Sequence, residues 1–377
     1  MLKRLKFLVY RFVLFLAKKK TNKRNKAVLI IKTDEIGDYV LWRNFATYYQ
    51  SCQRFLSYKK VLCGNIAWKN LYENFDAVCF DEVIWLDKKQ FKSNMLYRYR
   101  FLKNINARRF DTVINTIFSR SYYIDDSIVL AAYAEHTIGM PSNDNNVLPY
   151  EKGYDKNLYS ELAPLPMNNI FEFTRNKNFT IFATKQELPD IKLNFDNTNF
   201  HGKNKLPENY FVIFPGSNKS SRIWPASNFA QVASFIHNAM GYHVVICGAK
   251  TDLPYAEELK KKLDIPFTDL CGKTNLFEFL EVLKFSKCLV SIDTGSVHLA
   301  AAVQCPVFGV YNGSQYGRFA PYPGDVFKNF YAAYPAAVEN DIKNGHAKKY
   351  RYLSPVKYDE VSAEMIIELV KLFFEIN

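Results

Sequence analysis

Apolar runs alternate with helical patterns over the first third of the chain. The run at residues 27–32 (AVLIIK) has the character of a buried strand, and the segment 38–50 after it has the pattern of a helix. Further short apolar runs, which are the other strand candidates of this series, lie at 60–63, 78–80, 83–86 and 112–115. Strands separated by helices are typical of a parallel, doubly wound sheet.

A second series of the same kind begins at residue 210. Its strand candidates lie at 212–214, 243–247, 267–270, 288–292 and 307–311. Its helix candidates lie at 226–239, 255–263, 276–285 and 296–303, and an amphipathic helix at 362–374 closes the chain. Residues 150–207, between the two series, show the weakest pattern and are interpreted as the tail of the first domain followed by a linker.

The two series predict an α/β protein with two Rossmann-like, parallel-sheet domains. We expect an arm at 1–26, an N-terminal domain at 27–180, a linker at 181–207, a C-terminal domain at 208–350 and a C-terminal helix at 351–377. A chain of 377 residues suits two domains of roughly 150–200 residues each. Two such domains facing each other would form a cleft at the carboxyl ends of their strands, where ligands bind in such sheets.

The arm at 1–26 is basic and amphipathic. Its apolar stretch, residues 7–17, is interrupted by Arg11 and is shorter than the ~20 residues that a membrane-spanning helix needs. Three lysines follow it where a signal peptide would have a cleavage site. On a helix Arg4, Arg11 and Lys18 share one face because they are seven residues apart. Four apolar side chains lie away from that face: Leu5, Leu8, Phe12 and Phe15. This pattern is typical of a helix in the headgroup region of an anionic leaflet; the alternatives are a frayed tail and a helix docked on the body.

The net charge of +13 is regional. Residues 1–26 carry ten Lys or Arg and residues 88–109 carry eight, both without an acid, whereas the rest carries 32 basic and 37 acidic residues. Two surfaces that face something anionic would explain this, although a solvated helix face is the alternative for 88–109. No RNP, zinc-finger or helix-turn-helix signature supports nucleic-acid binding. Seven scattered cysteines without a C-x-x-C pair favour a reducing compartment and disfavour a zinc site.

The loop after the strand at 288–292 has the clearest binding chemistry. Gly295 and Ser296 open a helix, so that free backbone N–H groups and the positive end of the helix dipole can hold a diphosphate. His298 can add a donor, and Asp293 at the strand tip suits sugar hydroxyls. The alternative is that Asp293 caps the helix and His298 is a satisfied polar residue.

The loop at 215–225 combines hydroxyl and amide groups, among them Ser217 and Asn218, with the cations Lys219 and Arg222. A fixed guanidinium binds phosphate oxygens bidentately and neutralises a leaving phosphate without a metal. The alternative is a polar loop with a surface arginine. No D-x-D carboxylate pair is available as a metal holder, so we expect neither a metal nor a cofactor. The absence of G-x-G-x-x-G after either first strand also disfavours a dinucleotide site.

Asp38 has two interpretations. It is either the N-cap of the first helix or a general base that faces an acceptor hydroxyl from a strand tip. Its neighbours Asp34 and Glu35 either raise its pKa by like-charge repulsion or are solvated.

These loops, in this order, resemble glycosyltransferase family 9, the ADP-heptose lipopolysaccharide heptosyltransferases. The matching stretches are VLIIKTDEIGDYVL (28–41), FDTVINTIFSRS (110–121), VIFPGSNKSSRIWPASNFAQVA (212–233), VVICGAKTD (244–252) and DLCGKTNLFEFLEVLKFSKCLVSIDTGSVHLAAAVQCPVFGVYNGS (269–314). The resemblance implies a GT-B fold, an inverting single displacement and no required metal. It also implies that the N-terminal domain at 27–180 is acceptor-binding and that the C-terminal domain at 208–350 is nucleotide-sugar-binding. One departure is that Asp34 and Glu35 replace the family's small residues before I-G-D, which puts the acceptor in question.

The resemblance also implies roles for single residues. Asp38 is similar to the catalytic base, and Arg222 stands where the family contacts the donor phosphate and sugar. Asp293 is similar to the residue that grips the donor sugar. The remaining matches are the phosphate-contacting pair and the diphosphate binders: Ser217, Asn218, Thr294, Gly295 and His298.

The expected function is transfer of a sugar onto a lipopolysaccharide-type acceptor, and the favoured donor is ADP-heptose, which supplies heptose. The expected partners are the nucleotide-diphospho-sugar, a lipid-linked anionic glycan and the inner-membrane surface, with no nucleic acid. The expected location is cytoplasmic, peripheral on the inner face of the bacterial cytoplasmic membrane. Two alternatives stay open, namely another nucleotide-sugar used for O-chain or capsule synthesis, and a non-catalytic nucleotide-sugar-binding protein.

Overall fold

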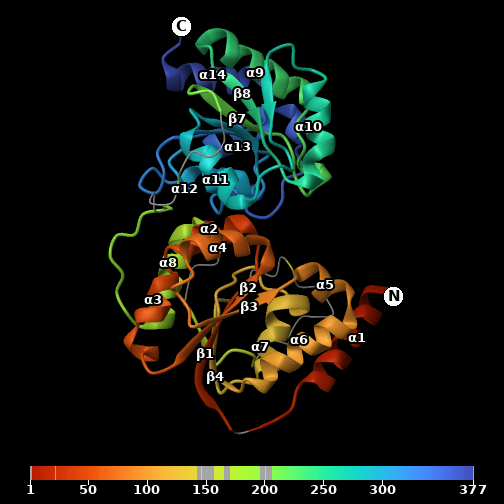
Figure 1. Cartoon of the computed structure of the whole chain (residues 1–377), viewed down its shortest axis with the longest axis vertical. Coiled ribbons are helices and arrows are strands. Elements are labelled where there is room, and N and C mark those ends of the chain that lie inside the picture. Colours follow the sequence, from red (N-terminus) through yellow and green to blue (C-terminus); the bar gives the residue numbers. More distant parts are fainter. Residues whose placement is uncertain are drawn as a thin grey trace. The chain divides into compact units, whose positions relative to one another are not determined.

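The computed structural model describes residues 2–21, 23–141, 146, 157–164, 170–195, 200 and 206–376. The chain forms two compact units (Figure 1). Unit 1 comprises Met1–Met167 and Phe173–Ile191, and unit 2 comprises Asn168–Glu172 and Lys192–Asn377. Part of the expected linker, residues 196–199 and 201–205, lies outside the described residues.

Unit 1 contains a six-stranded sheet in the order β3-β2-β1-β4-β5-β6, and each described pairing is parallel. Its strands are β1 Asn25–Lys32, β2 Lys59–Asn65, β3 Glu82–Leu86, β4 Phe110–Asn115, β5 His136–Gly139 and β6 Glu161–Leu162. Central strand β1 is apolar on both faces, as a parallel strand covered by helices must be, and its residues Val28 to Ile31 are fully buried.

The helices of unit 1 are α1 Leu2–Ala17, α2 Ile36–Arg43, α3 Ala46–Ser51, α4 Lys69–Phe75, α5 Lys88–Ser93, α6 Met95–Ala107, α7 Ser127–Ala132 and α8 Glu172–Thr184, with a π-helix, η3, at Tyr122–Asp126. Helix α1 packs beside α6 (Figure 1). The expectation of a frayed tail is therefore wrong for residues 2–17, which form a helix docked on the body. No helix among the described residues is long and apolar enough to cross a membrane.

Three sequence expectations in unit 1 are wrong. Residues 78–80 form a turn instead of a strand, with Cys79 and Phe80 buried and Val78 86% exposed. The helix expected at 38–50 is divided into α2 and α3 near Asn44, the C-cap of α2. Helix α8 lies in the segment 150–207, where no helix was expected. Its buried face is largely polar and includes Arg175, Asn176 and Thr180, so it gives no hydrophobic pattern.

Unit 2 contains a second six-stranded sheet in the order β12-β11-β10-β7-β8-β9, again parallel in its described pairings. Its strands are β7 Tyr210–Phe214, β8 His243–Ile246, β9 Phe267–Asp269, β10 Leu289–Ile292, β11 Val307–Val310 and β12 Phe330–Ala333. Its helices are α9 Ala226–Met240, α10 Leu253–Lys260, α11 Leu276–Phe285, α12 Gly295–Ala302, α13 Ala336–Lys343 and α14 Ala363–Phe374. Helices α9 and α14 lie side by side over one apolar core (Figure 1). The expected pair of parallel α/β domains is confirmed, and the cleft between them stays a prediction.

Candidate active site

Arg222 and Asp293 meet at the carboxyl edge of the unit 2 sheet. Asp293 directly follows β10, and Arg222 ends the short helix η6 (Ser220–Arg222) in the loop after β7. Strands β7 and β10 are neighbours, so their loops share one edge. Nη1 of Arg222 lies 3.2 Å from Oδ2 of Asp293 and donates to the Asp293 carbonyl oxygen at 3.0 Å. The structure thus brings together the two residues that the sequence placed 71 positions apart.

The Arg222–Asp293 pair is only partly open to solvent. The Arg222 side chain is 22% exposed and the Asp293 side chain 15%. Burial raises the pKa of Asp293, and the Arg222 and Lys219 cations oppose that rise. A guanidinium held in this way is pre-oriented toward an anion, because a single carboxylate does not saturate its five donors.

The start of helix α12 offers backbone donors. Thr294 is the N-cap in an extended conformation, and Gly295 is the first helical residue. Ser296 Oγ lies 2.7 Å from Thr294 Oγ1 and 2.9 Å from Ser291 Oγ, and the residue is buried. The Ser296 hydroxyl therefore holds the turn in place. This turn can bind an anion through the N–H groups that have no partner within the helix and through the positive end of the helix dipole.

His298 is buried one turn into α12, with Nδ1 2.5 Å from the Tyr322 hydroxyl. Burial lowers the pKa of His298 to about 4, against a smaller opposing effect of the Glu172 carboxylate. The imidazole is therefore neutral near pH 7. When Tyr322 donates to Nδ1, the ring proton is on Nε2, which makes His298 a neutral donor. The sequence indicated His298 but not Tyr322, because no local spacing connects them.

The loop after β7 is packed against the loop after β8. A Cβ on Gly216 would lie 2.3 Å from the Asp252 carboxyl carbon, so this approach requires glycine. Asp252 in turn accepts from the Ala249 N–H at 2.8 Å. Ser217 is buried, and its Oγ accepts from the Lys219 N–H at 3.2 Å, whereas Asn218 is exposed. Ser217 thus shapes the loop, and Asn218 lies on its surface.

Asp38 is half-buried in the first turn of α2, after the central strand of unit 1. The N-cap is Glu35, so the expectation that Asp38 itself is the N-cap is wrong. Asp38 Oδ2 accepts from the Glu35 N–H at 3.3 Å, which is one half of a capping box. The positive end of α2 also favours a carboxylate at this position. Capping and proton abstraction use the same ionised form, so the two roles are compatible.

Asp34 is the strongly perturbed acid of this loop. Its Oδ2 lies 3.0 Å from Nζ of Lys32, whose side chain is fully buried, whereas the Asp34 side chain is 18% exposed. Burial raises the pKa of Asp34 to about 7; Lys32 opposes this and the Asp38 carboxylate adds to it. Sequence analysis considered this like-charge effect for Asp38, and the structure shows it at Asp34. The buried Lys32 was missed because it reads as the end of a strand.

Further contacts tie the same loop to its surroundings. Thr33 Oγ1 donates to Asp125 Oδ1 of η3 at 2.6 Å, and Lys88 of α5 forms an ion pair with Glu35 at 2.5 Å. Asn65, at the end of β2, donates to the Asp34 carbonyl at 2.9 Å. The loop that carries Asp38 is therefore fixed from three sides.

A groove of ≈ 450 Å³ opens beyond β2 and β3, at the same carboxyl edge of the sheet as Asp38. Its lining combines aromatic, amide and charged groups: Ile66, Trp85, Asp87, Gln90, Asn94, Leu96, Tyr97 and Arg100. Asp87 and Asn94 cap helices α5 and α6, so the groove has a fixed outline. Five of its residues belong to the basic segment 88–109 and a sixth, Asp87, immediately precedes it.

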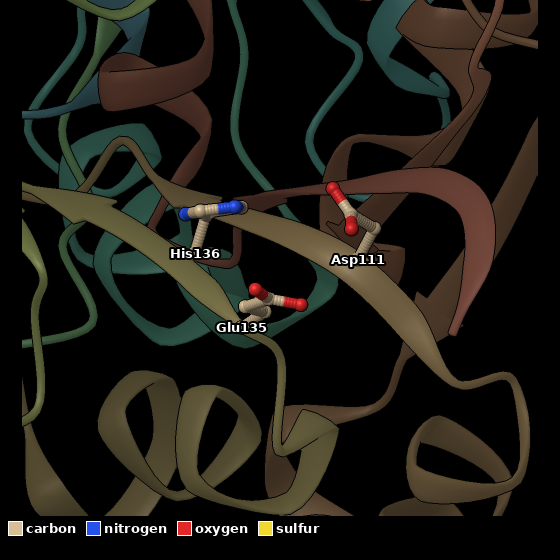
Figure 2. Close-up of side chains that lie close together, drawn as sticks. All are labelled: Asp111, Glu135 and His136. Atoms are coloured by element: carbon tan, nitrogen blue, oxygen red, sulfur yellow. The ribbon is translucent and has the colours of Figure 1, made fainter. Parts of the chain in front are cut away.

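Figure 2 shows Asp111, Glu135 and His136, whose ligand atoms lie within 4.8 Å of one another. They lie at the amino ends of β4 and β5, at the edge of the sheet opposite Asp38. Asp111 Oδ2 already accepts from Tyr58 at 3.0 Å and from Thr112 at 2.9 Å, and Glu135 and His136 are exposed. We assign this cluster no role, and transfer without a metal stays a prediction.

Solved structures with this architecture include a glycosyl transferase family 9 protein from Veillonella parvula DSM 2008. It superposes with a TM-score of 0.69 at 17% identity, covering 95% of this chain and 100% of that one. The E. coli heptosyltransferase WaaC with ADP-2-deoxy-2-fluoro heptose gives a TM-score of 0.65 at 16% identity, covering 92% and 99%. At these identities the likeness concerns the fold alone, and it confirms the GT-B fold.

Sequence relatives agree with the fold. Lipopolysaccharide heptosyltransferase 3 from Escherichia coli is 24% identical over 159 residues, which are 41% of this chain and 46% of the relative. Lipooligosaccharide heptosyltransferase 2 from Haemophilus influenzae is 33% identical over 92 residues, which are 23% and 26% of the two chains. The matched segments thus span less than half the length of these curated relatives.

The sequence model of the family described as glycosyltransferase family 9 (heptosyltransferase) matches residues 98–346, well over half of the chain. The matched region includes most of the basic helix α6, the loops that carry Arg222 and Asp293, and helix α12 with His298. Because this match covers most of the chain and the fold agrees with it, the chain belongs to glycosyltransferase family 9.

Proposed function

We propose that the protein is an inverting, metal-independent glycosyltransferase that moves a sugar, in the first place heptose from ADP-heptose, onto a lipopolysaccharide-type glycolipid. The observation that carries the proposal is the Arg222–Asp293 pair beside the start of α12, in a chain of this family. The relatives named above have lipopolysaccharide or lipooligosaccharide in their names, and one solved neighbour holds an ADP-heptose analogue. These names support the choice of donor and acceptor.

Unit 2 supplies the donor chemistry in this proposal. The first N–H groups of α12 and the Arg222 guanidinium bind the diphosphate, which becomes more negative as the glycosidic bond breaks. Asp293 accepts hydrogen bonds from the sugar hydroxyls. Further contacts to the diphosphate come from Ser217, Asn218, Thr294, Gly295, Ser296 and His298. Charge neutralisation by Arg222 and a helix end is what allows transfer without a metal.

Unit 1 supplies the base. Asp38 takes the proton of the acceptor hydroxyl while the oxygen of that hydroxyl forms a bond to the anomeric carbon. The bond from that carbon to the diphosphate oxygen breaks on the opposite face, and its electron pair leaves with the nucleoside diphosphate. Attack from the opposite face inverts the anomeric configuration. The capping contact from Glu35 holds the Asp38 carboxylate in one orientation.

The groove beside Trp85 and Tyr97 fits the acceptor glycan. Aromatic faces pack against sugar rings, and the amide and carboxylate groups of the lining suit hydroxyls. Arg100 and the cations of segment 88–109 complement phosphate or acidic sugars. An acceptor that is lipid-linked places the reaction at the cytoplasmic face of the inner membrane. The charged pair Asp34 and Glu35 favours, as a second candidate, an acceptor of O-chain or capsule type.

Transfer assays with ADP-, UDP-, GDP- and dTDP-sugars test the proposal, each with lipopolysaccharide-core, O-chain and capsule acceptors. We expect turnover with the ADP-sugar, unchanged by a chelator. A thermal-shift series with ADP, UDP, GDP and NAD should show the largest shift with ADP. Stabilisation by a nucleotide without transfer to any acceptor would instead indicate a non-catalytic binding protein. Loss of turnover on chelation would overturn the metal-independent mechanism.

A further inference from the structure

Helix α1 has two apolar faces. Its inner face, which includes Phe7, Tyr10 and Leu14, is buried against unit 1. The other face points to solvent and consists of large side chains at helical spacing, the most exposed being Phe15 at 75%; we call it the outward face: Leu5, Leu8, Val9, Phe12, Phe15 and Leu16. A contiguous exposed patch of this kind marks an interaction surface, whereas single exposed apolar residues need no explanation.

The inner face fixes α1 firmly to unit 1. The Tyr10 hydroxyl donates to the Lys92 carbonyl at 2.5 Å, and the buried Arg98 guanidinium lies 4.1 Å from the Tyr10 ring centroid. The rings of Phe7 and Tyr122 have centroids 4.8 Å apart. Just beyond the helix, the Lys19 N–H donates to Asn106 at 3.0 Å. Because these contacts already satisfy the inner face, the outward face has no place in the core to which it could turn.

The charged residues of α1 and of the segment directly after it are all positive. Arg4, Lys6 and Arg11 are exposed on α1, Lys19 and Lys20 are exposed just after it, and residues 1–33 contain no Asp or Glu. A second copy of this chain on the same face would bring two such cation sets together. An anionic surface instead gains from both the cations and the apolar side chains. At 16 residues, α1 is too short to span a bilayer but well suited to lie in its plane.

We propose that the outward face of α1 inserts into the interfacial region of an anionic bilayer and holds unit 1 on the membrane. Phe12, Phe15 and the leucines enter the boundary between headgroups and acyl chains, and the cations contact lipid phosphates. Apolar burial and electrostatic attraction together supply the two signals that stable but reversible membrane binding requires. The inference deepens the location proposed above but does not depend on the transfer chemistry.

The first experiment is flotation of the full-length protein with vesicles. We expect binding to vesicles of phosphatidylglycerol and phosphatidylethanolamine, and little binding to pure phosphatidylcholine. The double variant Phe12→Ser with Phe15→Ser should weaken binding at least about tenfold, because it removes most of the inserted aromatic area. A matched control, Phe285→Ser, changes an exposed phenylalanine of unit 2 and should bind as the wild type does.

The second experiment locates the contact directly. All seven native cysteines are buried, so an introduced surface cysteine can be labelled selectively. An environment-sensitive fluorophore on Phe15→Cys should shift to the blue on addition of anionic vesicles, whereas the same label on Val78→Cys, elsewhere on unit 1, should not. The variant Arg4→Gln with Lys6→Gln and Arg11→Gln should reduce binding and its dependence on salt.

Three results would overturn the inference: wild-type protein that stays off anionic vesicles, a Phe12/Phe15 double variant that binds as well as the wild type, or a dimer that forms through α1. Light scattering across a range of concentrations tests the last. Transfer to a delipidated, soluble acceptor should be the same in the double variant and the wild type. Loss of vesicle binding with transfer intact therefore separates this inference from the proposed function.

Discussion

The carboxyl edges of the two sheets each carry a cation paired with a carboxylate, but the two pairs are set in opposite ways. In unit 1 the cation Lys32 is fully buried and its partner Asp34 is the more exposed. In unit 2 the guanidinium of Arg222 is the more exposed, and Asp293 is set deeper. The more exposed partner determines what a ligand meets. Unit 1 therefore presents carboxylates and unit 2 presents positive charge, although both edges belong to the same kind of sheet.

This difference supports the proposed division of the reaction between the two units. An edge that presents carboxylates suits proton removal from an acceptor, and an edge that presents a guanidinium and a helix start suits a departing diphosphate. The surrounding contacts agree with the assignment. Asp38 is held by a backbone N–H in unit 1, whereas His298 in unit 2 is kept neutral by burial. If the division holds, substitutions in unit 1 should impair proton removal without weakening donor binding, and substitutions in unit 2 should weaken donor binding.

The largest expected effect is that of Asp38→Asn. An amide cannot take the acceptor proton, so kcat should fall by about 10²- to 10⁴-fold. The amide oxygen can still accept from the Glu35 N–H, so the thermal midpoint should change little. ADP binding, measured by calorimetry, should stay as in the wild type. Weakened ADP binding with unaltered turnover of the bound donor would show that Asp38 has a structural role.

Arg222→Met should act on the other edge. It removes the guanidinium from the diphosphate and leaves Asp293 without its cationic partner, so ADP affinity should fall roughly 10- to 100-fold. Arg222→Lys keeps the charge without the planar fork and should recover part of the affinity. Calorimetric titration with ADP measures both variants. Equal ADP affinity in Arg222→Met and the wild type would remove Arg222 from the donor site.

Asp34 should make unit 1 sensitive to pH near neutrality. Its pKa of about 7 in the folded protein lies above its ordinary value of 3.8, so the folded state binds more protons between about pH 4 and 7. The Asp34 contribution to stability is therefore fully present below pH 4 and is lost as the pH rises through 7. Since one pKa unit corresponds to about 1.4 kcal/mol and the side chain keeps some contact with solvent, we expect a loss of about 2 kcal/mol.

Carbon-detected NMR titration of the Asp34 carboxyl should show a midpoint near 7. Asp34→Asn should flatten the fall of the thermal midpoint between pH 5 and 8, whereas Asp264→Asn, at an exposed site of unit 2, should leave that fall unchanged. An Asp34 carboxyl that titrates near pH 4 would show that Lys32 outweighs burial.

The architecture could be predicted from the sequence because parallel strands are apolar on both faces. Strands β1 and β10 are such runs, and their loops carry the chemistry. Residues 78–80 were wrongly predicted as a strand because two of the three side chains are buried, although the segment is a turn that pairs with no strand. Helix α8 was missed for the opposite reason, since Asn176 and Thr180 are buried through hydrogen bonds to Leu41 and Tyr49. Hydrophobic periodicity cannot detect a buried face made of polar groups.

The loops of the candidate site could be predicted from the sequence, but the contacts between them could not, because these depend on the order of the strands in the sheet. The loops with Arg222 and Asp293 were recognisable, but their contact depends on β7 lying next to β10, which local patterns do not specify. Lys32 reads as a strand end, and its burial follows from the packing around it. Tyr322 lies 24 residues from His298, and their contact depends on the path of a long loop. The residues that tune the site were therefore harder to find than those expected to bind the ligand.

The smallest expected effect comes from that last contact. Tyr322→Phe removes the hydroxyl beside Nδ1 of His298 and leaves a buried nitrogen without its partner, at a cost of about 1 kcal/mol. It also removes the group that selects the tautomer with its proton on Nε2. Nitrogen NMR of the imidazole should therefore show that tautomer in the wild type and a mixture in the variant, with ADP binding weakened several-fold. If His298 kept the same tautomer in Tyr322→Phe, its tautomer would be set by burial alone. The His298 side chain in unit 2 would then lack an orienting hydrogen bond of the kind that holds Asp38 in unit 1.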